Sequence, residues 1–252
     1  MTDMPPPPPP NMGPPPGYVA YGGANAAPQG AQAIGGLSKA LAVLLFIMIP
    51  LQILGVFATI GVSEKAKDFL DGSISRTEFE DATEANLSTF AGLFVIPIAV
   101  LTIIWMYRMA GNLRVLGRSG ATWAPGWAIG GWFVPPCVLY VVPWLMFKEL
   151  WRGSDPDVGY GDPSWKQGRV APIVTVWWVM YGLLPLVGIF TAASIVTQFS
   201  SGGVDVDDLA KQYDKYANLN LAMAVVGIGT TAVYLVFVRQ LSARHMRATR
   251  EA

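Results

Sequence analysis

The stretch LAVLLFIMIPLQILGVFATIGV, Leu41 to Val62, contains no charged residue and decides the fold class. A helix of about 20 residues crosses the roughly 30 Å apolar core of a bilayer, so this run is long enough to span it. Three further charge-free runs also reach a spanning length. The sequence therefore predicts four transmembrane helices, at about residues 41–62, 89–106, 170–198 and 219–238.

The composition of the whole chain agrees with an all-α integral membrane protein. Of its 252 residues, 52% are hydrophobic and only 13% are charged, which is unusually apolar for a soluble domain of this size. The formal net charge is zero, so overall basicity implies no nucleic-acid partner. The single cysteine, Cys137, leaves no second thiol for an intramolecular disulfide or a cysteine metal cluster.

A fifth apolar stretch, Pro125 to Trp144, is interrupted by proline and glycine. In a continuous helix, Pro135, Pro136 and Pro143 would each remove a donor and clash with the preceding turn, at about 3 kcal/mol apiece. We therefore expect a re-entrant or interfacial segment over residues 123–152, in preference to a fifth crossing. Indole rings favour the headgroup layer, and this region is rich in them. Its tryptophans are Trp123, Trp127, Trp132, Trp144 and Trp151.

The two ends of the chain differ in composition. Residues 1–36 contain PPPPPP and PPP and almost nothing to bury, which predicts a disordered tail with polyproline II character. Such a tail is more commonly a solvated spacer, and the alternative is a docking arm for a protein partner. After the helical membrane domain, residues 37–241, comes a basic tail, 242–252, in which His245 is expected to be solvated.

The distribution of basic residues bears on orientation, because cytoplasmic loops retain Lys and Arg. The basic C-terminal tail is therefore expected in the cytoplasm. Four crossings of the cytoplasmic membrane put both termini there, whereas a fifth crossing would place the N-terminus outside. Counting basic residues alone barely separates these two topologies.

Several motifs resemble a known family. They are Trp105-x-Tyr107-Arg108, Asn112, Leu116-Gly117, Pro125-Gly-Trp127-Ala128 with Trp132-Phe133-x-Pro135, and the segment from Glu149 to Pro156. Together they resemble a bacterial, mostly actinobacterial, integral membrane family catalogued as domain of unknown function 4328, over roughly residues 40 to 240. The resemblance implies a multi-helix membrane protein and no known biochemical activity. The family typically has an asparagine where this sequence has Val138.

The strongest site candidates follow the second predicted helix. Arg108 and Asn112, four residues apart, share a helical face and are expected either to cap carbonyls of the broken segment or to meet Glu149. The alternative for this basic cluster is contact with anionic lipid headgroups. The candidate structural or functional cluster is Trp105, Arg108, Asn112, Pro125, Trp127, Trp132, Pro135, Glu149 and Trp151. The candidate lipid-headgroup contacts are Arg114, Arg118, Arg244 and Arg247.

The sequence carries no nucleotide-binding loop, metal-ligand spacing or catalytic triad, so we expect no cofactor and no enzymatic activity. No charge lies near the centre of a predicted helix, which disfavours ion-coupled transport. Polar residues there, such as Gln52 and Thr102, are expected to bond to backbone or across helices. The leading hypothesis is a non-enzymatic scaffold or regulatory protein whose proline-rich arm recruits a partner. The alternative is a channel or transporter for a neutral solute that uses the re-entrant segment.

Overall fold

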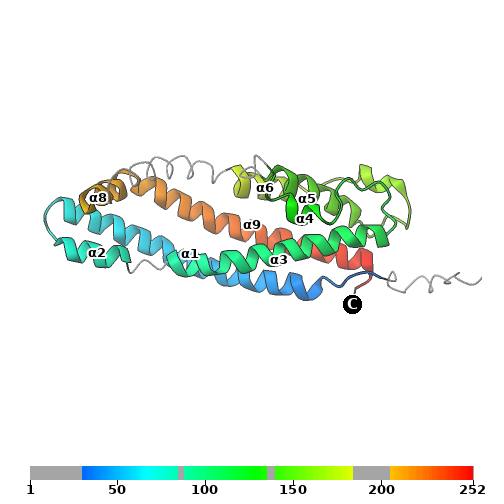
Figure 1. The fold of residues 1–252 in the computed structure, drawn as a ribbon, viewed down its shortest axis with the longest axis horizontal. Coiled ribbons are helices and arrows are strands. Elements are labelled where there is room, and N and C mark those ends of the chain that lie inside the picture. The colour runs from blue at the N-terminus through cyan, green and yellow to red at the C-terminus, as the bar shows by residue number, and fades with distance from the viewer. Residues whose placement is uncertain (1–29, 85–87, 135–139, 184–204, 252) are drawn as a thin grey trace, which may run out of the picture.

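The computed structural model describes residues 30–84, 88–134, 140–183 and 205–251, and every regular element in them is helical (Figure 1). The long helices are α1 (Gly35–Leu70), α3 (Ser88–Val115) and α9 (Ala217–Thr249). The shorter elements are α2 (Arg76–Glu84), α4 (Trp127–Gly130), α5 (Val141–Gly153), the 3₁₀ turn η2 (Pro163–Gln167), α6 (Pro172–Trp178), the π-helical turn η3 (Val179–Leu183) and α8 (Val206–Lys215).

Three described helices are long and apolar enough to cross a membrane: α1, residues Gly92–Val115 of α3, and α9. The predicted runs 41–62, 89–106 and 219–238 lie within α1, α3 and α9, so their helical conformation is confirmed. The fourth predicted crossing, 170–198, is described only in its first part, as α6 and η3. The remainder of that run lies outside the described residues.

The outer surface of these helices is apolar. Phe57 on α1 is 66% exposed, and Ile96 on α3 is 72% exposed. Exposing such a surface to water is unfavourable by about 25 cal/mol per Å², whereas lipid chains solvate it without that penalty. The exposed apolar band and the three spanning-length helices together indicate a membrane protein.

The helices α1 and α9 are longer than the bilayer is thick. They contain 36 and 33 residues, which at 1.5 Å per residue gives about 54 and 50 Å, against an apolar core of about 30 Å. At one end of the bundle, α1 packs with α2 and α8 to form what we call the distal cap (Figure 1). There Phe79 of α2 is fully buried, stacked on Phe69 and edge-on to Tyr213, with ring centroids 5.3 and 6.4 Å apart.

The opposite end, where α1 begins and α9 ends, is called the terminal end here. An aromatic core holds α3, α5, α6 and α9 together at this end. The Phe147 ring of α5 lies 5.9 Å from Trp105, 5.0 Å from Trp177 and 5.0 Å from Phe237. Phe147 and Trp151 of α5 are buried inside the protein, so Trp151 does not lie in the headgroup layer as its position in a tryptophan-rich segment had suggested.

The apolar stretch from Pro125 to Trp144, called the Pro/Gly/Trp segment from here on, forms no membrane-length helix in its described residues. α4 has only four residues, turns continue to Val134, and α5 begins at Val141. Gly131 is tightly enclosed, because a Cβ there would lie 2.6 Å from the Trp127 carbonyl oxygen and 2.6 Å from the Val142 side chain. A continuous fifth crossing is therefore absent from the described part of this segment, and re-entry into the bilayer stays a prediction.

Both predicted tails contribute structured residues. Ile34, assigned to a disordered tail ending at residue 36, is fully buried at the start of α1. Most of the predicted basic tail, 242–252, is the last part of α9, and His245 within it is fully buried. The prediction of a solvated histidine is wrong, because His245 continues the buried stripe of α9 one helical turn beyond Leu241.

The Phe79→Ala variant tests the distal cap. Truncating a buried phenylalanine costs about 3–5 kcal/mol, so amide hydrogen exchange in α2 and α8 is expected to accelerate while the terminal end of α9 keeps its protection. Phe57→Ala removes the same atoms from a lipid-facing position and serves as the control. Equal exchange rates in the two variants would show that Phe79 does not hold the cap.

Candidate functional site

Three of the predicted site residues lie on one face of α3. Their side chains form hydrogen bonds with α9 or with the residues just before α1. Trp105 is fully buried, and its Nε1 donates to Ser242 Oγ of α9 at 3.0 Å. Arg108 Nη1 donates to the Ala33 carbonyl oxygen at 2.8 Å. Asn112, one turn further along, is only 1% exposed. This face of α3 therefore connects two distant parts of the sequence.

Asn112 uses its whole carboxamide. Its Oδ1 accepts from the Gln32 backbone N–H at 2.8 Å, and its Nδ2 donates to the Gln32 carbonyl oxygen at 2.9 Å. The same Nδ2 lies 3.0 Å from His245 Nε2. The Asn112 side chain thus forms hydrogen bonds with both backbone groups of Gln32 and also contacts α9.

These bonds determine the tautomer of His245. Because Asn112 Oδ1 must face the Gln32 N–H, Nδ2 faces the ring, and an amide nitrogen can only donate. Nε2 of His245 therefore accepts, and the ring proton sits on Nδ1. Nδ1 then donates to Ser154 Oγ, 2.7 Å away, just after α5. The result is a buried chain of hydrogen bonds from Ser154 through His245 and Asn112 to Gln32.

The Ser154–His245 pair does not have the arrangement of a nucleophile and its base. A base must accept the hydroxyl proton, whereas this histidine donates to the hydroxyl. Both side chains are also fully buried, so Ser154 Oγ has no open side for a substrate. We interpret the pair as a structural link between α5 and α9.

The first amides of α1 are capped by the other end of the chain. Ile34 and Gly35 donate their backbone N–H groups to Glu251 Oε2 and Oε1, at 2.9 and 2.8 Å. α1 has no side-chain cap and no acid in its first turn, so this carboxylate satisfies donors that a helix start leaves free and complements the positive end of the helix dipole. Arg250, in a left-handed conformation with φ 54°, turns the chain so that Glu251 reaches back.

The Arg118 side chain is buried and forms hydrogen bonds within the protein. It is 3% exposed, and its guanidinium donates to four carbonyl oxygens, one at the end of α5 and three in the loop that follows, at 2.6–3.0 Å. Burial lowers the pKa of Arg118 from its usual value, while nearby Asp155 and Asp162 act in the opposite direction. This position corrects the predicted lipid-headgroup contact for Arg118. The four acceptors are the carbonyls of Gly153, Asp155, Val158 and Gly159.

The other three predicted lipid contacts differ in their surroundings. Arg244 Nη2 lies 2.6 Å from Asp155 Oδ2, and its Nε donates to the Trp151 carbonyl oxygen, so its charge is already paired within the protein. Arg114 and Arg247 are exposed. Headgroup contact by these two residues stays a prediction.

The expected contact between Arg108 and Glu149 is not formed. Glu149 instead accepts from the backbone N–H groups of Thr122 and Trp123, at 2.7 and 3.0 Å, and so fixes the approach to α4. Arg108 is 75 residues from its acceptor, Ala33. Sequence spacing could not reveal either partner, because each contact joins segments that are distant along the chain.

The remaining predicted site residues lie in the Pro/Gly/Trp segment. Pro125 precedes α4 and accepts from the Ala128 N–H at 2.9 Å. Trp127 is exposed, and Trp132 is half-buried. Pro135 lies outside the described residues. The structure therefore joins only part of the predicted cluster at the terminal end.

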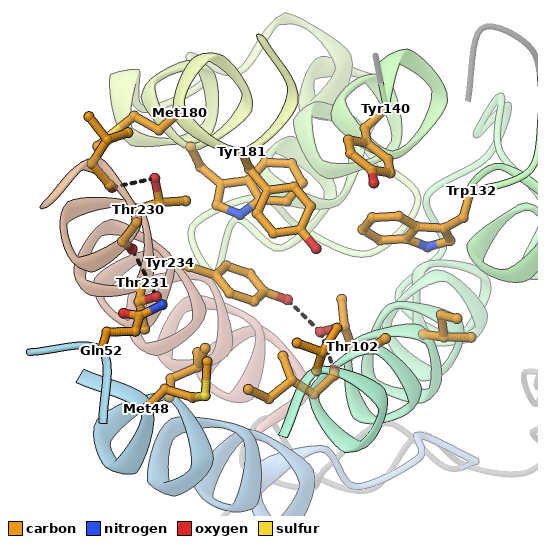
Figure 2. Close-up of a pocket in the computed structure, with 18 of the residues that line it drawn as sticks. Met48, Gln52, Thr102, Trp132, Tyr140, Met180, Tyr181, Thr230, Thr231 and Tyr234 are labelled. Atoms are coloured by element: carbon orange, nitrogen blue, oxygen red, sulfur yellow. Dashed lines mark hydrogen bonds between the residues drawn. The ribbon is translucent and has the colours of Figure 1, made fainter. Parts of the chain in front are cut away.

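A cavity of about 690 Å³ lies beside this cluster, between α1, α3 and α9 (Figure 2). α6, η3 and the Pro/Gly/Trp segment supply its other walls. In Figure 2, Met48 and Gln52 lie at one side of the cavity and Trp132 and Tyr140 at the other. Its described lining is mainly aliphatic and aromatic and includes no acidic, basic or histidine side chain.

Most hydroxyl groups of this lining are already paired. Thr102 Oγ1 and Tyr234 Oη are 2.6 Å apart, and Thr230 and Thr231 donate to carbonyl oxygens of their own helix. The expectation that Thr102 bonds to backbone and across helices is confirmed, since it also donates to the Ile98 carbonyl.

Three buried polar atoms in the described lining have no hydrogen-bond partner: Gln52 Oε1, Trp132 Nε1 and Trp177 Nε1. Trp177 is only 1% exposed. An unpaired buried polar group costs about 1–3 kcal/mol, so pairing these atoms would stabilise the protein. They are closed off from solvent in this structure, so a ligand would pair with them only after the side chains around them shift. Sequence reasoning named Gln52 but missed Trp177, whose position in the cavity depends on how α6 packs against α9.

The described residues contain no group of three or more His, Cys, Asp or Glu side chains able to hold a metal ion. No curated protein and no solved structure matches the chain. A family model described as Domain of unknown function (DUF4328) matches residues 70–243, which include Asn112 and Ser154 and end just before His245. That match covers more than half of the chain, and the protein therefore belongs to this family of unknown function.

Proposed function

We propose that this chain is a non-enzymatic scaffold or regulatory protein of the cytoplasmic membrane, and that its proline-rich N-terminal arm recruits a protein partner. The observation that carries the proposal is the clamp on residues 32–35, immediately after the arm. Asn112, Arg108 and Glu251 together bond backbone groups of all four of these residues. A simple spacer would have no need of such an attachment.

Fixing residues 32–35 to the bundle holds the proline-rich arm close to the membrane, where a partner can bind it. Thirteen residues lie between Pro16 and Gly30, so a partner bound at the proline runs would stay within about 50 Å of the terminal end. Restricting an arm in this way raises the effective concentration of its binding site near the membrane. A polyproline II helix also loses little entropy on binding, which suits it to docking.

The topology we propose has four crossings and both termini in the cytoplasm. Glu251 bonds to Ile34 and Gly35, so the two ends of the described chain lie on the same side. Two ends on one side of a membrane require an even number of crossings. The basic residues at the end of α9 favour the cytoplasm for that side, and they are Arg239, Arg244, Arg247 and Arg250.

A pathway for a neutral solute is the second candidate, and the cavity is the observation that favours it. Trp132, Phe133 and Tyr140 of the Pro/Gly/Trp segment all contribute to its lining. The mainly apolar walls offer little to a hydrated solute, so this function ranks below the scaffold. Solute flux into liposomes that is reduced by Trp132→Ala would favour the pathway.

Removing two side chains of the clamp should release the base of the arm. In an Arg108→Ala/Glu251→Ala variant, backbone groups of residues 33–35 lose charge-assisted bonds of about 1.5–3 kcal/mol each. Amide hydrogen exchange at Ile34 and Gly35 is then expected to accelerate about tenfold or more. Arg247→Ala is the matched control, because it removes an exposed arginine of the same end without touching the clamp. Unchanged exchange in the double variant would rule out the clamp.

Deleting residues 2–29 should abolish recruitment of the partner while membrane insertion continues. The comparison is quantitative co-purification from membranes that contain the full chain, the deletion variant or the Arg108→Ala/Glu251→Ala variant. We expect the partner to be lost with the deletion and reduced when only the clamp is removed. A set of co-purified proteins that is identical in all three samples would refute the scaffold proposal.

A further inference from the structure

The cavity between α1, α3 and α9 is partly open, and its edge adjoins the apolar outer surface of the bundle. Two of its lining residues, Val95 and Phe133, are also exposed on the apolar outer surface of the bundle. That surface faces lipid chains in a membrane-spanning bundle. A molecule dissolved in the bilayer would therefore meet the cavity at this edge.

The size and charge of the cavity restrict what it can hold. Its volume of about 690 Å³ falls within the 300–1,000 Å³ typical of ligand sites. The described lining has no carboxylate, amine, guanidinium or imidazole group, so a charged headgroup would be buried without a partner. The walls fit a hydrocarbon chain and a neutral polar group.

The unpaired atoms specify that polar group further. Once a ligand shifts the side chains that enclose them, Trp132 Nε1 and Trp177 Nε1 can donate to an ester carbonyl, and Gln52 Oε1 can accept from a hydroxyl. From these complementary groups we propose that the cavity binds a neutral lipid with one acyl chain, an ester carbonyl and two free hydroxyl groups, the monoacylglycerol class. This site is independent of the arm clamp and of partner recruitment.

A photoactivatable monoacylglycerol, with a diazirine in its acyl chain, is the probe that tests this site in the purified full chain. Illumination followed by peptide mass spectrometry is expected to find cross-links on peptides that contain Met48, Met180 or Met223. Unlabelled monoacylglycerol should compete them away. The anionic fatty acid of equal chain length and the corresponding alkane should compete poorly, since each lacks part of the neutral headgroup.

Two glycine variants separate the cavity from the lipid-facing surface. A Cβ at Gly227 would point into space bounded by Gln52 Nε2, 4.0 Å away, so Gly227→Leu places a side chain in the cavity. Gly55→Leu is the matched control, because a Cβ there meets nothing within 4 Å and Gly55 is not a lining residue. We expect cross-linking to fall about tenfold or more in Gly227→Leu and to stay unchanged in the control.

Gln52→Leu gives a second readout that does not depend on filling the cavity. Leucine removes the unpaired acceptor, so the ligand-free protein should melt at a higher temperature than the unaltered chain. The same change should weaken monoacylglycerol binding about fivefold, because the ligand hydroxyl loses its acceptor. A protein that is more stable yet binds the probe less tightly is the expected combination.

Three results would overturn the proposal. One is equal cross-linking in Gly227→Leu and Gly55→Leu. Another is labelling spread along lipid-facing peptides of α1 and insensitive to unlabelled monoacylglycerol, which is contact with bulk lipid. Equal competition by the alkane or the fatty acid would overturn the neutral headgroup.

Discussion

The carboxamide of Asn112 is the interaction on which the terminal end depends. Its oxygen and nitrogen bind both backbone groups of Gln32, and its nitrogen also meets His245, which in turn holds Ser154. Removing the Asn112 side chain would leave a buried imidazole nitrogen and two backbone groups without hydrogen-bond partners. Because these bonds belong to one network, the stability lost exceeds the sum of the separate bonds. One residue of α3 therefore keeps the start of the chain, α5 and α9 in register.

The rest of the bundle follows from the solvent that surrounds it. A lipid-exposed backbone must satisfy its own hydrogen bonds, so the apolar runs become long helices with apolar outer faces. Beyond the bilayer, contacts among protein side chains and loops stabilise the structure. Phe79 packs between three helices at the distal cap, and Arg118 donates hydrogen bonds to backbone carbonyls at the terminal end. Between these ends, packing within the described residues is incomplete at the cavity.

The sequence predicted those structural features that depend on residues close together along the chain. The length of the charge-free runs predicted α1, α3 and α9, and proline chemistry predicted that residues 125–144 would not form one continuous helix. Partners distant along the chain were not predictable, as Glu251 at the start of α1 shows. His245 was read as solvated because arginines surround it in the sequence. Its spacing from buried residues of α9 was the signal that would have corrected this: Tyr234, Val238 and Leu241 precede it at intervals of four, three and four.

The central claim is that the base of the N-terminal arm is fixed to the end of α9 by the network around Asn112. Spin labels at Gly36→Cys and Arg247→Cys, with Cys137→Ser and the protein in lipid nanodiscs, measure this attachment directly through the distance distribution between them. A Cβ at Gly36 meets nothing within 4 Å, so a label is accommodated there. A single narrow distribution that broadens in Asn112→Leu is the predicted result. A distribution that is already broad with Asn112 intact would contradict the claim.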